Sequence, residues 1–416
     1  MRDTSFSICK AIAIILVVLS HAGAPSWINH WIFQFHVPIF FICAGYFFNT
    51  KYLHEEGTFL AHRIKGLYVP FVKWSLVLLC LHNLLFPLGI LSETYGNAAG
   101  GVLHPYSWHE FSQRLWSILF NMSGYDEFLG GTFWFFRALL VSSILFLVLF
   151  KLFQRLRIAR SKSEVAWMIM GCSLLFALWQ VLGGLRVTGL AQGGYREFMG
   201  LYLMSVGFIF KEQRSLIPLN YITALICLAV TVLGACFFPT SMGFRADFQQ
   251  FAGFLLPSVA GFFFIYYLST KIDLLKGGII KRGLVYIGDH TLYIFAFHLF
   301  AFKIVSAIKV AVYGLPWEQI GNHTVVNAYR DDYFCWLYLL AGVSVPLLVR
   351  HVYLRAAKTF DLSLKNCLRV GFKWFLLALI YLVRGVIVFC RAIHSGFKGF
   401  IQGMRDIIQA SNPKDE

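Results

Sequence analysis

The sequence predicts an all-α fold, a polytopic membrane bundle of about ten transmembrane helices followed by a basic amphipathic helix. The first observation is composition, because 58% of the 416 residues are hydrophobic and 13% are charged, whereas soluble domains carry about 25% charged residues. The second is a mean hydropathy of +0.67. The third is a series of apolar stretches long enough to cross a bilayer. Together they exclude an ordinary soluble domain.

Apolar stretches of membrane-spanning length recur along most of the chain. The sixth is the shortest, and all of them precede residue 355. The predicted spans cover residues 6–24, 29–50, 67–91, 132–153, 164–184, 197–212, 218–238, 250–270, 284–312 and 333–354. We therefore predict a membrane domain over residues 1–355.

Lysine and arginine are distributed unequally between alternate loops, and this predicts the orientation. One set of loops contains Lys51, Arg63, Lys65, Lys151, Arg155, Arg157, Arg160, Lys162, Lys211, Arg214, Lys271, Lys276, Lys281 and Arg282. In the alternate set, arginines are fewer and are mixed with aspartate and glutamate. The positive-inside rule places the first set and both termini in the cytoplasm. The net charge of +16 is thus explained by topology and predicts no nucleic-acid partner.

Two alternatives concern the ends of the membrane domain. Residues 1–24 have the basic start and apolar core of a signal peptide, but the orientation of the later loops requires an uncleaved, inward-facing start. Residues 356–416 predict a cytoplasmic basic amphipathic helix and tail, bound to anionic membrane lipid. Its basic residues share one helical arc: Lys365, Arg369, Lys373, Arg384, Arg391, Lys398 and Arg405. An eleventh span over 374–390 is the alternative, made costly by Arg384.

Ionisable residues inside predicted spans are the first candidate functional residues, because burying them in a bilayer is expensive. His21, His36 and Arg137 lie toward the predicted outer ends of their spans, and His298 lies near the middle of the ninth. Histidine can take a proton from an alcohol or act as a nucleophile near neutral pH. Packing or interfacial roles are the alternative for each histidine, and snorkelling for Arg137.

Basic residues on the predicted cytoplasmic side are the second group. Lys10 precedes His21 by eleven residues, so the two share one helical face about 16 Å apart. Arg63 and Lys65 stand in "AHRIKGLYVPF", just before the third span. They could hold the phosphates of an anionic cytosolic donor, although ordinary positive-inside charge also explains them.

Several common catalytic motifs are missing from the sequence. It has no G-x-S-x-G elbow, H-E-x-x-H pair or Walker loop, so serine hydrolase, zinc protease and ATPase readings lack support. Its nine cysteines form no C-x-x-C pair, which favours small buried hydrophobic side chains over disulfides or a zinc site.

Five segments, in this order, resemble the acyltransferase 3 family of integral membrane acyltransferases, in its fucose-4-O-acetylase-like branch. Lys10 and His21 match the basic-x10-His signature of the first helix, although Ser7 stands where this branch usually has an Asp. The other segments are "FHVPIFFICAGYFF", "RIKGLYVPF", "GTFWFFRALL" and "IGDHTLYIFAFH". The resemblance covers residues 2 to about 355.

The resemblance implies an acyl-CoA-dependent O-acyltransferase of the bacterial cytoplasmic (inner) membrane, most often an acetyltransferase. Acetyl-CoA would come from the cytosol, and the acceptor would be a hydroxyl of a surface or secreted glycan or glycolipid. His21 would be the general base or transient acyl carrier, with His36 beside it. Lys10, Arg63 and Lys65 would hold the donor, Arg137 and His298 would bind the acceptor, and no metal would be needed.

Two other classes remain open on sequence. A secondary transporter or flippase of a glycan or other polar solute also has charged groups within about ten helices, but we find no paired Gly/Pro interruptions of the kind transporter halves show. A membrane scaffold would lose no activity on replacement of His21.

Overall fold

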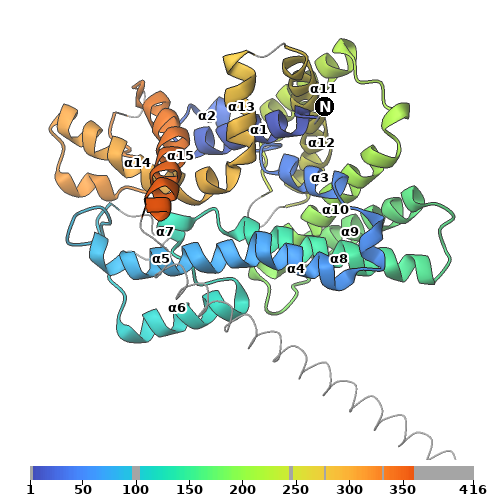
Figure 1. Cartoon of the computed structure of the whole chain (residues 1–416), viewed down its shortest axis with the longest axis horizontal. Helices are drawn as coiled ribbons and strands as arrows, with labels where there is room; N and C mark the ends of the chain where they lie inside the picture. Colours follow the sequence, from blue (N-terminus) through green and yellow to red (C-terminus); the bar gives the residue numbers. More distant parts are fainter. Residues whose placement is uncertain (1–2, 96–103, 243–246, 276–277, 330–331, 360–416) are drawn as a thin grey trace, which may run out of the picture. The chain divides into compact units, whose positions relative to one another are not determined.

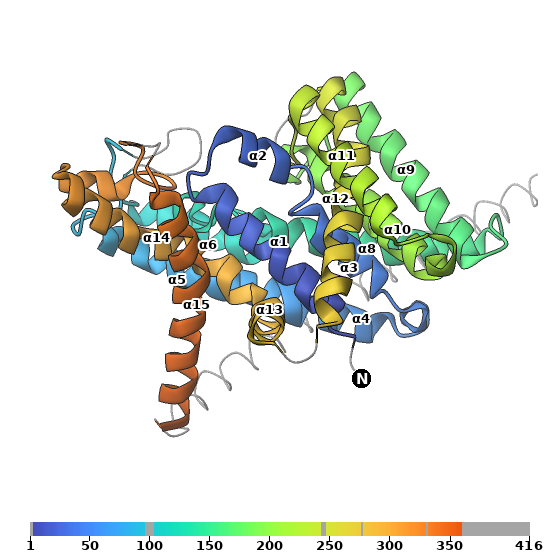
Figure 2. The ribbon, with the colours of Figure 1, turned by 90° about the horizontal axis from the view of Figure 1, so that it is seen from above.

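The computed structural model describes residues 3–95, 104–242, 247–275, 278–329 and 332–359. All regular structure within these ranges is helical, which confirms the predicted all-α class. Helix α1 lies between α14 on one side and α11 and α12 on the other (Figures 1 and 2). It contacts α12, α13 and α14 directly, so the helix that carries Lys10 and His21 is central to the bundle.

Most of the described residues lie in helices. In chain order they are α1 (Ser5–His21), α2 (Ser26–Ile32), α3 (Pro38–Tyr46), η1 (Thr50–Leu53), α4 (Glu56–Arg63), η2 (Ile64–Tyr68), α5 (Val69–Leu85), α6 (Trp108–Asn121), α7 (Glu127–Gly130), α8 (Trp134–Arg155), α9 (Lys162–Gly183), η3 (Ala191–Gly194), α10 (Tyr195–Glu212), η4 (Arg214–Leu216), α11 (Tyr221–Phe237), α12 (Phe248–Asp273), α13 (Ile279–Asp289), α14 (Thr291–Tyr313), η5 (Trp317–Gly321) and α15 (Phe334–Thr359).

Six helical segments in the described ranges are long and apolar enough to cross a membrane. They are Glu56–Leu85, α8, α9, α12, α14 and Phe334–Arg355. Helices α1 and α11 are apolar but shorter, and α10 is almost wholly buried against α3, α8 and α9. The chain is therefore a multi-pass membrane protein, whereas the count of about ten spans stays a prediction.

Two predicted spans are interrupted, which corrects their description as continuous helices. The span over 29–50 is divided into α2 and α3 by a turn at residues 33–37, and Pro38 occupies the first turn of α3. A proline favours that position because it has no N–H to donate. The span over 284–312 is divided at His290 into α13 and α14. The first of these breaks places His36 in the turn.

The third span is longer than predicted and contains a π-helical turn. Helices α4 and α5 run on through η2, a π-helix over Ile64–Tyr68. Pro70 follows directly, and a proline within a helix would clash with the carbonyl four residues earlier. The wider turn accommodates it.

Helix α6 was not anticipated from hydropathy. Its apolar residues alternate with charged and polar ones, including Glu110 and Arg114, so no window reaches membrane-spanning apolarity. Its start is nevertheless readable in the sequence, because Ser107 and Glu110 form a capping box, a common helix start signal.

The contacts divide the chain into a unit ending at Arg350 and a second unit from His351. Of the second unit the structure describes only the end of α15, to Thr359. The predicted amphipathic helix and tail, and the alternative span over 374–390, lie outside the described residues. The boundary near residue 355 stays a prediction.

Helices α3 and α10 approach each other so closely that two glycines touch the opposite backbone. A Cβ on Gly45 would lie 1.9 Å from the Met204 carbonyl oxygen, and one on Gly207 would lie 1.9 Å from that of Ile42. Only glycine permits this approach, which is common between membrane helices. The contact joins α3, which follows His36, to α10, whose first turn carries Arg196.

Gly207→Ala is expected to destabilise the protein by about 1–3 kcal/mol, because the added methyl forces α3 and α10 apart. Denaturant unfolding in detergent micelles would measure the loss. Gly171→Ala in α9 is the matched control, since its Cβ would meet no atom within 4 Å, and it should be neutral or slightly stabilising. Equal losses in the two variants would contradict the close-packing argument.

Candidate functional site

Three histidines meet where α1 ends. The His21 ring, in the last turn of α1, lies 5.3 Å from the His298 ring of α14, measured between centroids. His36, in the turn before α3, lines the same cavity as His21. His36 is 3% exposed and His298 is fully buried. Three segments far apart in sequence thus bring these imidazoles together.

Hydrogen bonds from these rings define their tautomers. Nδ1 of His21 lies 2.8 Å from the Val17 carbonyl oxygen, and Nδ1 of His36 lies 2.6 Å from that of Ile32. Nδ1 of His298 lies 3.0 Å from two carbonyl oxygens, those of Ile294 and Phe295. A carbonyl only accepts, so each neutral ring donates from Nδ1 and keeps a lone pair on Nε2. Each Nε2 can therefore act as a base.

The cavity beside His21 has a volume of about 200 Å³. We call it the histidine chamber. Its lining includes His21, His36, Thr132, Trp134, Phe135 and Arg196. The Arg196 guanidinium lies 4.0 Å from the centre of the Trp134 ring, a cation–π contact. The chamber thus combines bases, a cation and aromatic walls.

Arg137 lies in α8 beside the chamber but is not among its lining residues. Its Nε donates to Glu197 Oε1 at 3.0 Å, and Ser142 Oγ donates to the Glu197 carbonyl oxygen at 2.8 Å. The Arg137 and Glu197 side chains are 5% and 0% exposed. This ion pair joins α8 to the first turn of α10, the turn that presents Arg196.

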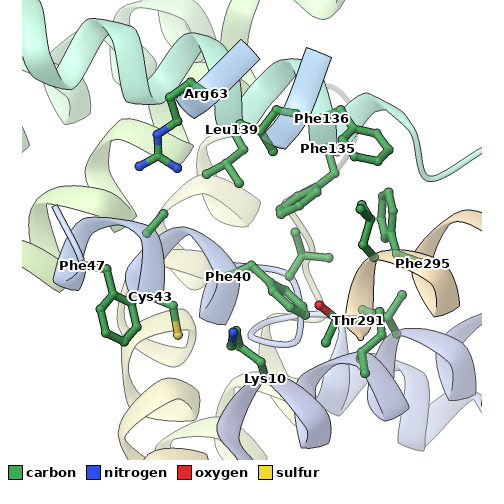
Figure 3. A pocket seen from close by; sticks show the side chains of 16 residues that line it. Lys10, Phe40, Cys43, Phe47, Arg63, Phe135, Phe136, Leu139, Thr291 and Phe295 are labelled. Atoms are coloured by element: carbon green, nitrogen blue, oxygen red, sulfur yellow. The ribbon is translucent and has the colours of Figure 1, made fainter. Parts of the chain in front are cut away.

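A second cavity, of about 320 Å³, lies against the other half of α1. We call it the basic cavity. Its lining includes Lys10, Phe40, Cys43, Phe47, Arg63 and Thr291. Lys10 and Arg63 point into it from opposite walls, with Phe135 and Phe295 at its aromatic side (Figure 3). Lys65 is exposed and is not among the lining residues. The basic cavity therefore brings Lys10 to Arg63 but not to Lys65.

The basic cavity and the histidine chamber are neighbours. Four side chains line both: Val17, Val37, Phe135 and Phe295. The two spaces thus lie end to end along α1, with Lys10 and Arg63 in one and His21 in the other. Lys10 and His21, which the sequence predicts on one face of a helix, thus line neighbouring cavities along α1.

The start of α1 is held by a carboxylate from another helix. Ser7 Oγ donates to Asp289 Oδ1 of α13 at 2.8 Å. A Cβ on Gly288 would lie 1.8 Å from the Ser7 carbonyl oxygen, so the two backbones touch. A carboxylate is therefore present next to Ser7, although the chain has no Asp at that position.

The segment between α14 and α15 covers the His21 end of α1. Thr324 Oγ1 donates to the His21 carbonyl oxygen at 2.6 Å. Lys303 Nζ donates to the carbonyl oxygens of Ile320 and Asn322, at 3.0 and 2.7 Å. Burial and then the charge of Lys303 lower the pKa of His323, in this segment, to about 4. His323 is thus neutral near pH 7.

Arg196 and the covering segment were not singled out from sequence. Arg196 lies just before the sixth predicted span, where the sequence indicates only one of the few arginines of the alternate set of loops. The sequence does contain an indication of this role. Arg196 and Glu197 stand side by side at the start of an apolar run, and charged side chains are costly to bury there unless they serve a structural or functional purpose. Within the described residues, no cluster of three or more His, Cys, Asp or Glu is arranged to hold a metal ion.

The fold and the site define a class: a polytopic helical membrane protein with a buried histidine chamber adjoining a basic cavity. A protein-family model described as an acyltransferase domain matches residues 3–349. The chain belongs to this family, the acyltransferase 3 family, as its motifs predicted.

One curated relative is the nodulation protein NolL of Mesorhizobium japonicum (strain LMG 29417 / CECT 9101 / MAFF 303099). The two are 24% identical over 245 residues, which cover 54% of this chain and 56% of NolL. The chain thus spans little more than half the length of this relative. None of the solved structures matches the chain.

Arg137→Ala is expected to lower the free energy of unfolding by about 3–5 kcal/mol, because it leaves the Glu197 carboxylate buried without its ion-pair partner. Denaturant unfolding in micelles would measure the change. The double variant Arg137→Leu with Glu197→Leu removes both charges and should lose less than Arg137→Ala. A larger loss in the double variant would show that the ion pair does not account for the effect.

Proposed function

We propose that the chain is a membrane-bound O-acyltransferase that moves an acyl group, acetyl in the first instance, from acyl-CoA to a hydroxyl of a surface or secreted glycan. Membership of the acyltransferase 3 family supports acyl transfer. The single observation that carries the proposal is the end-to-end arrangement of the two cavities. A cationic space adjoins a chamber that holds imidazoles with basic Nε2 atoms.

The basic cavity suits the donor. Coenzyme A carries several phosphate charges and a long, largely uncharged arm that ends in the thioester. Lys10 and Arg63 supply positive charge, and aromatic walls suit the arm. Lys65, exposed on the neighbouring turn, is placed to meet phosphates that remain outside. With the predicted orientation, this end of α1 is cytoplasmic, where acyl-CoA is found.

His21 carries the chemical step in this proposal. Its Nε2 takes the proton of the acceptor hydroxyl while that oxygen attacks the thioester carbonyl carbon. A C–O bond forms, the C–S bond breaks, and the departing CoA thiolate receives the proton that His21 took up. Direct attack by Nε2, with a transient acyl-histidine, uses the same lone pair and is the second route.

The remaining chamber residues suit a sugar-like acceptor. The Arg196 guanidinium presents several N–H donors for hydroxyl oxygens, and the Trp134 ring holds it in place. His36 and His298 lie beside His21 and orient the acceptor or the base. Arg137 does not touch the acceptor in this proposal. It positions the helix turn that carries Arg196.

A transporter or flippase is the second candidate, and the two broken spans favour it, because transporters bind solutes at discontinuous helices. Consumption of acyl-CoA separates the two candidates, since a transporter would move solute without releasing free CoA.

His21→Ala is expected to abolish acylation of the glycan, with a loss of at least about 100-fold from removal of a general base. Acetyl-specific mass spectrometry of surface and secreted glycans, from cells producing matched amounts of protein, would measure it. His30→Ala, at an exposed histidine in α2, is the control and should retain acylation. Unchanged acylation in His21→Ala would exclude His21 as the base.

Arg63→Ala and Lys10→Ala are expected to raise the KM for acetyl-CoA by roughly tenfold or more, the effect of losing a charge-assisted hydrogen bond. CoA release by membranes containing each variant would report the KM. Arg155→Ala, at an exposed arginine in the last turn of α8, should leave it unchanged. An equal rise in all three would point to general surface charge and not to the basic cavity.

A further inference from the structure

The boundary between the two cavities is built from four side chains, Val17, Val37, Phe135 and Phe295. Phe135 comes from α8 and Phe295 from α14, and their ring centroids are 5.4 Å apart at an interplanar angle of 58°. Whatever passes between the basic cavity and the histidine chamber meets these residues.

Neighbouring rings hold both aromatic side chains in place. Phe135 packs edge-on against Phe41 and Phe40, with centroids 5.3 and 5.8 Å away. Phe295 packs against Phe136 at 5.2 Å and Phe133 at 6.2 Å. Closely packed rings resist displacement, so Phe135 and Phe295 limit the space available on both sides of the boundary.

The boundary is also tied to the bases. The Val17 carbonyl oxygen accepts the His21 Nδ1 hydrogen bond, and the Phe295 carbonyl oxygen accepts that of His298. Thr132 Oγ1 also donates to the Phe295 carbonyl oxygen, at 3.4 Å. Two of the four boundary residues, Val17 and Phe295, thus orient the imidazoles with their backbones while their side chains line both cavities.

We infer that these four side chains select the length of the acyl chain, admitting acetyl and excluding longer acyl groups; the inference rests on the proposed acyltransferase function. A donor whose phosphates lie near Lys10 and Arg63 must bring its thioester to the boundary to reach His21. The acyl group then enters the histidine chamber first. With about 200 Å³, the chamber must hold that group together with the acceptor hydroxyl.

Inside-out membrane vesicles that contain the full chain and its own glycan acceptor provide the test. They receive radiolabelled acetyl-, butanoyl- or hexanoyl-CoA, and label in the glycan fraction is counted. The wild type should prefer acetyl to hexanoyl by at least about tenfold, the scale on which a pocket discriminates a methylene. Phe135→Ala and Phe295→Ala should reduce that preference by about tenfold or more.

Phe146→Ala is the matched control. Phe146 is a buried phenylalanine of the same helix α8 and packs against Phe48 and Phe208. It is not among the residues lining either cavity. It should keep the wild-type preference even if total incorporation falls through lost stability. Phe135→Leu and Phe295→Leu repeat the test with a smaller loss of volume, for the case that an alanine variant does not fold.

The outcomes separate the inference from the proposed function. Acetyl incorporation with an unchanged preference in the folded Phe135 and Phe295 variants would overturn the selector and leave the acyltransferase standing. Equal incorporation of hexanoyl and acetyl groups by the wild type would also overturn the selector without affecting the proposed acyltransferase function. Failure of the wild type to incorporate label from any of the three thioesters would overturn both.

Discussion

The hydrogen bond from His21 Nδ1 to the Val17 carbonyl oxygen is the interaction on which the site depends. It lies within one turn of α1, so the helix itself determines which ring nitrogen carries the proton. The lone pair is then on Nε2, while the side chain of Val17 lies on the boundary with the basic cavity. One short contact thus relates the tautomer of His21 to the boundary between the two cavities.

Buried charges elsewhere in the bundle have structural partners, and this distinguishes them from the chamber. His82 pairs with Asp126, whose carboxylate also caps α7. Lys309 Nζ lies 2.9 Å from an Asp332 carboxylate oxygen, and Lys303 donates to two loop carbonyls. Unpaired charge in a membrane protein is expensive, so these pairings hold the loops against the ends of the helices. In contrast, the buried Nε2 of His298, whose ring lies next to that of His21, has no hydrogen-bond partner among the residues that the structure describes.

The two arginines near the chamber show where sequence reasoning reached its limit. Arg137 stands within the family segment "GTFWFFRALL" and an apolar run, so the sequence predicts an acceptor-binding residue. In the structure its guanidinium pairs with Glu197, and Arg196, the neighbour of Glu197 in the first turn of α10, lines the chamber. The ion pair between α8 and α10 decides which arginine faces a cavity. The spacing of residues along one helix cannot predict such a contact. The apolar run over 29–50 likewise gives no indication of the turn at residues 33–37, although Pro38 stands where that turn ends.

The sequence by itself determined the helical membrane class, most of the helix positions, the family and the shared face of Lys10 and His21. These depend on local properties: apolar content, the 3.6-residue period and short ordered motifs. Tertiary structure alone decided that His298 lies next to His21, that Arg63 faces Lys10 across a cavity, and that Phe135 and Phe295 line both this cavity and the chamber. The physical reason is that each of these relations joins side chains from different helices. Their meeting depends on how the helices pack, as at Gly45 and Gly207, and not on the order of residues within any one of them.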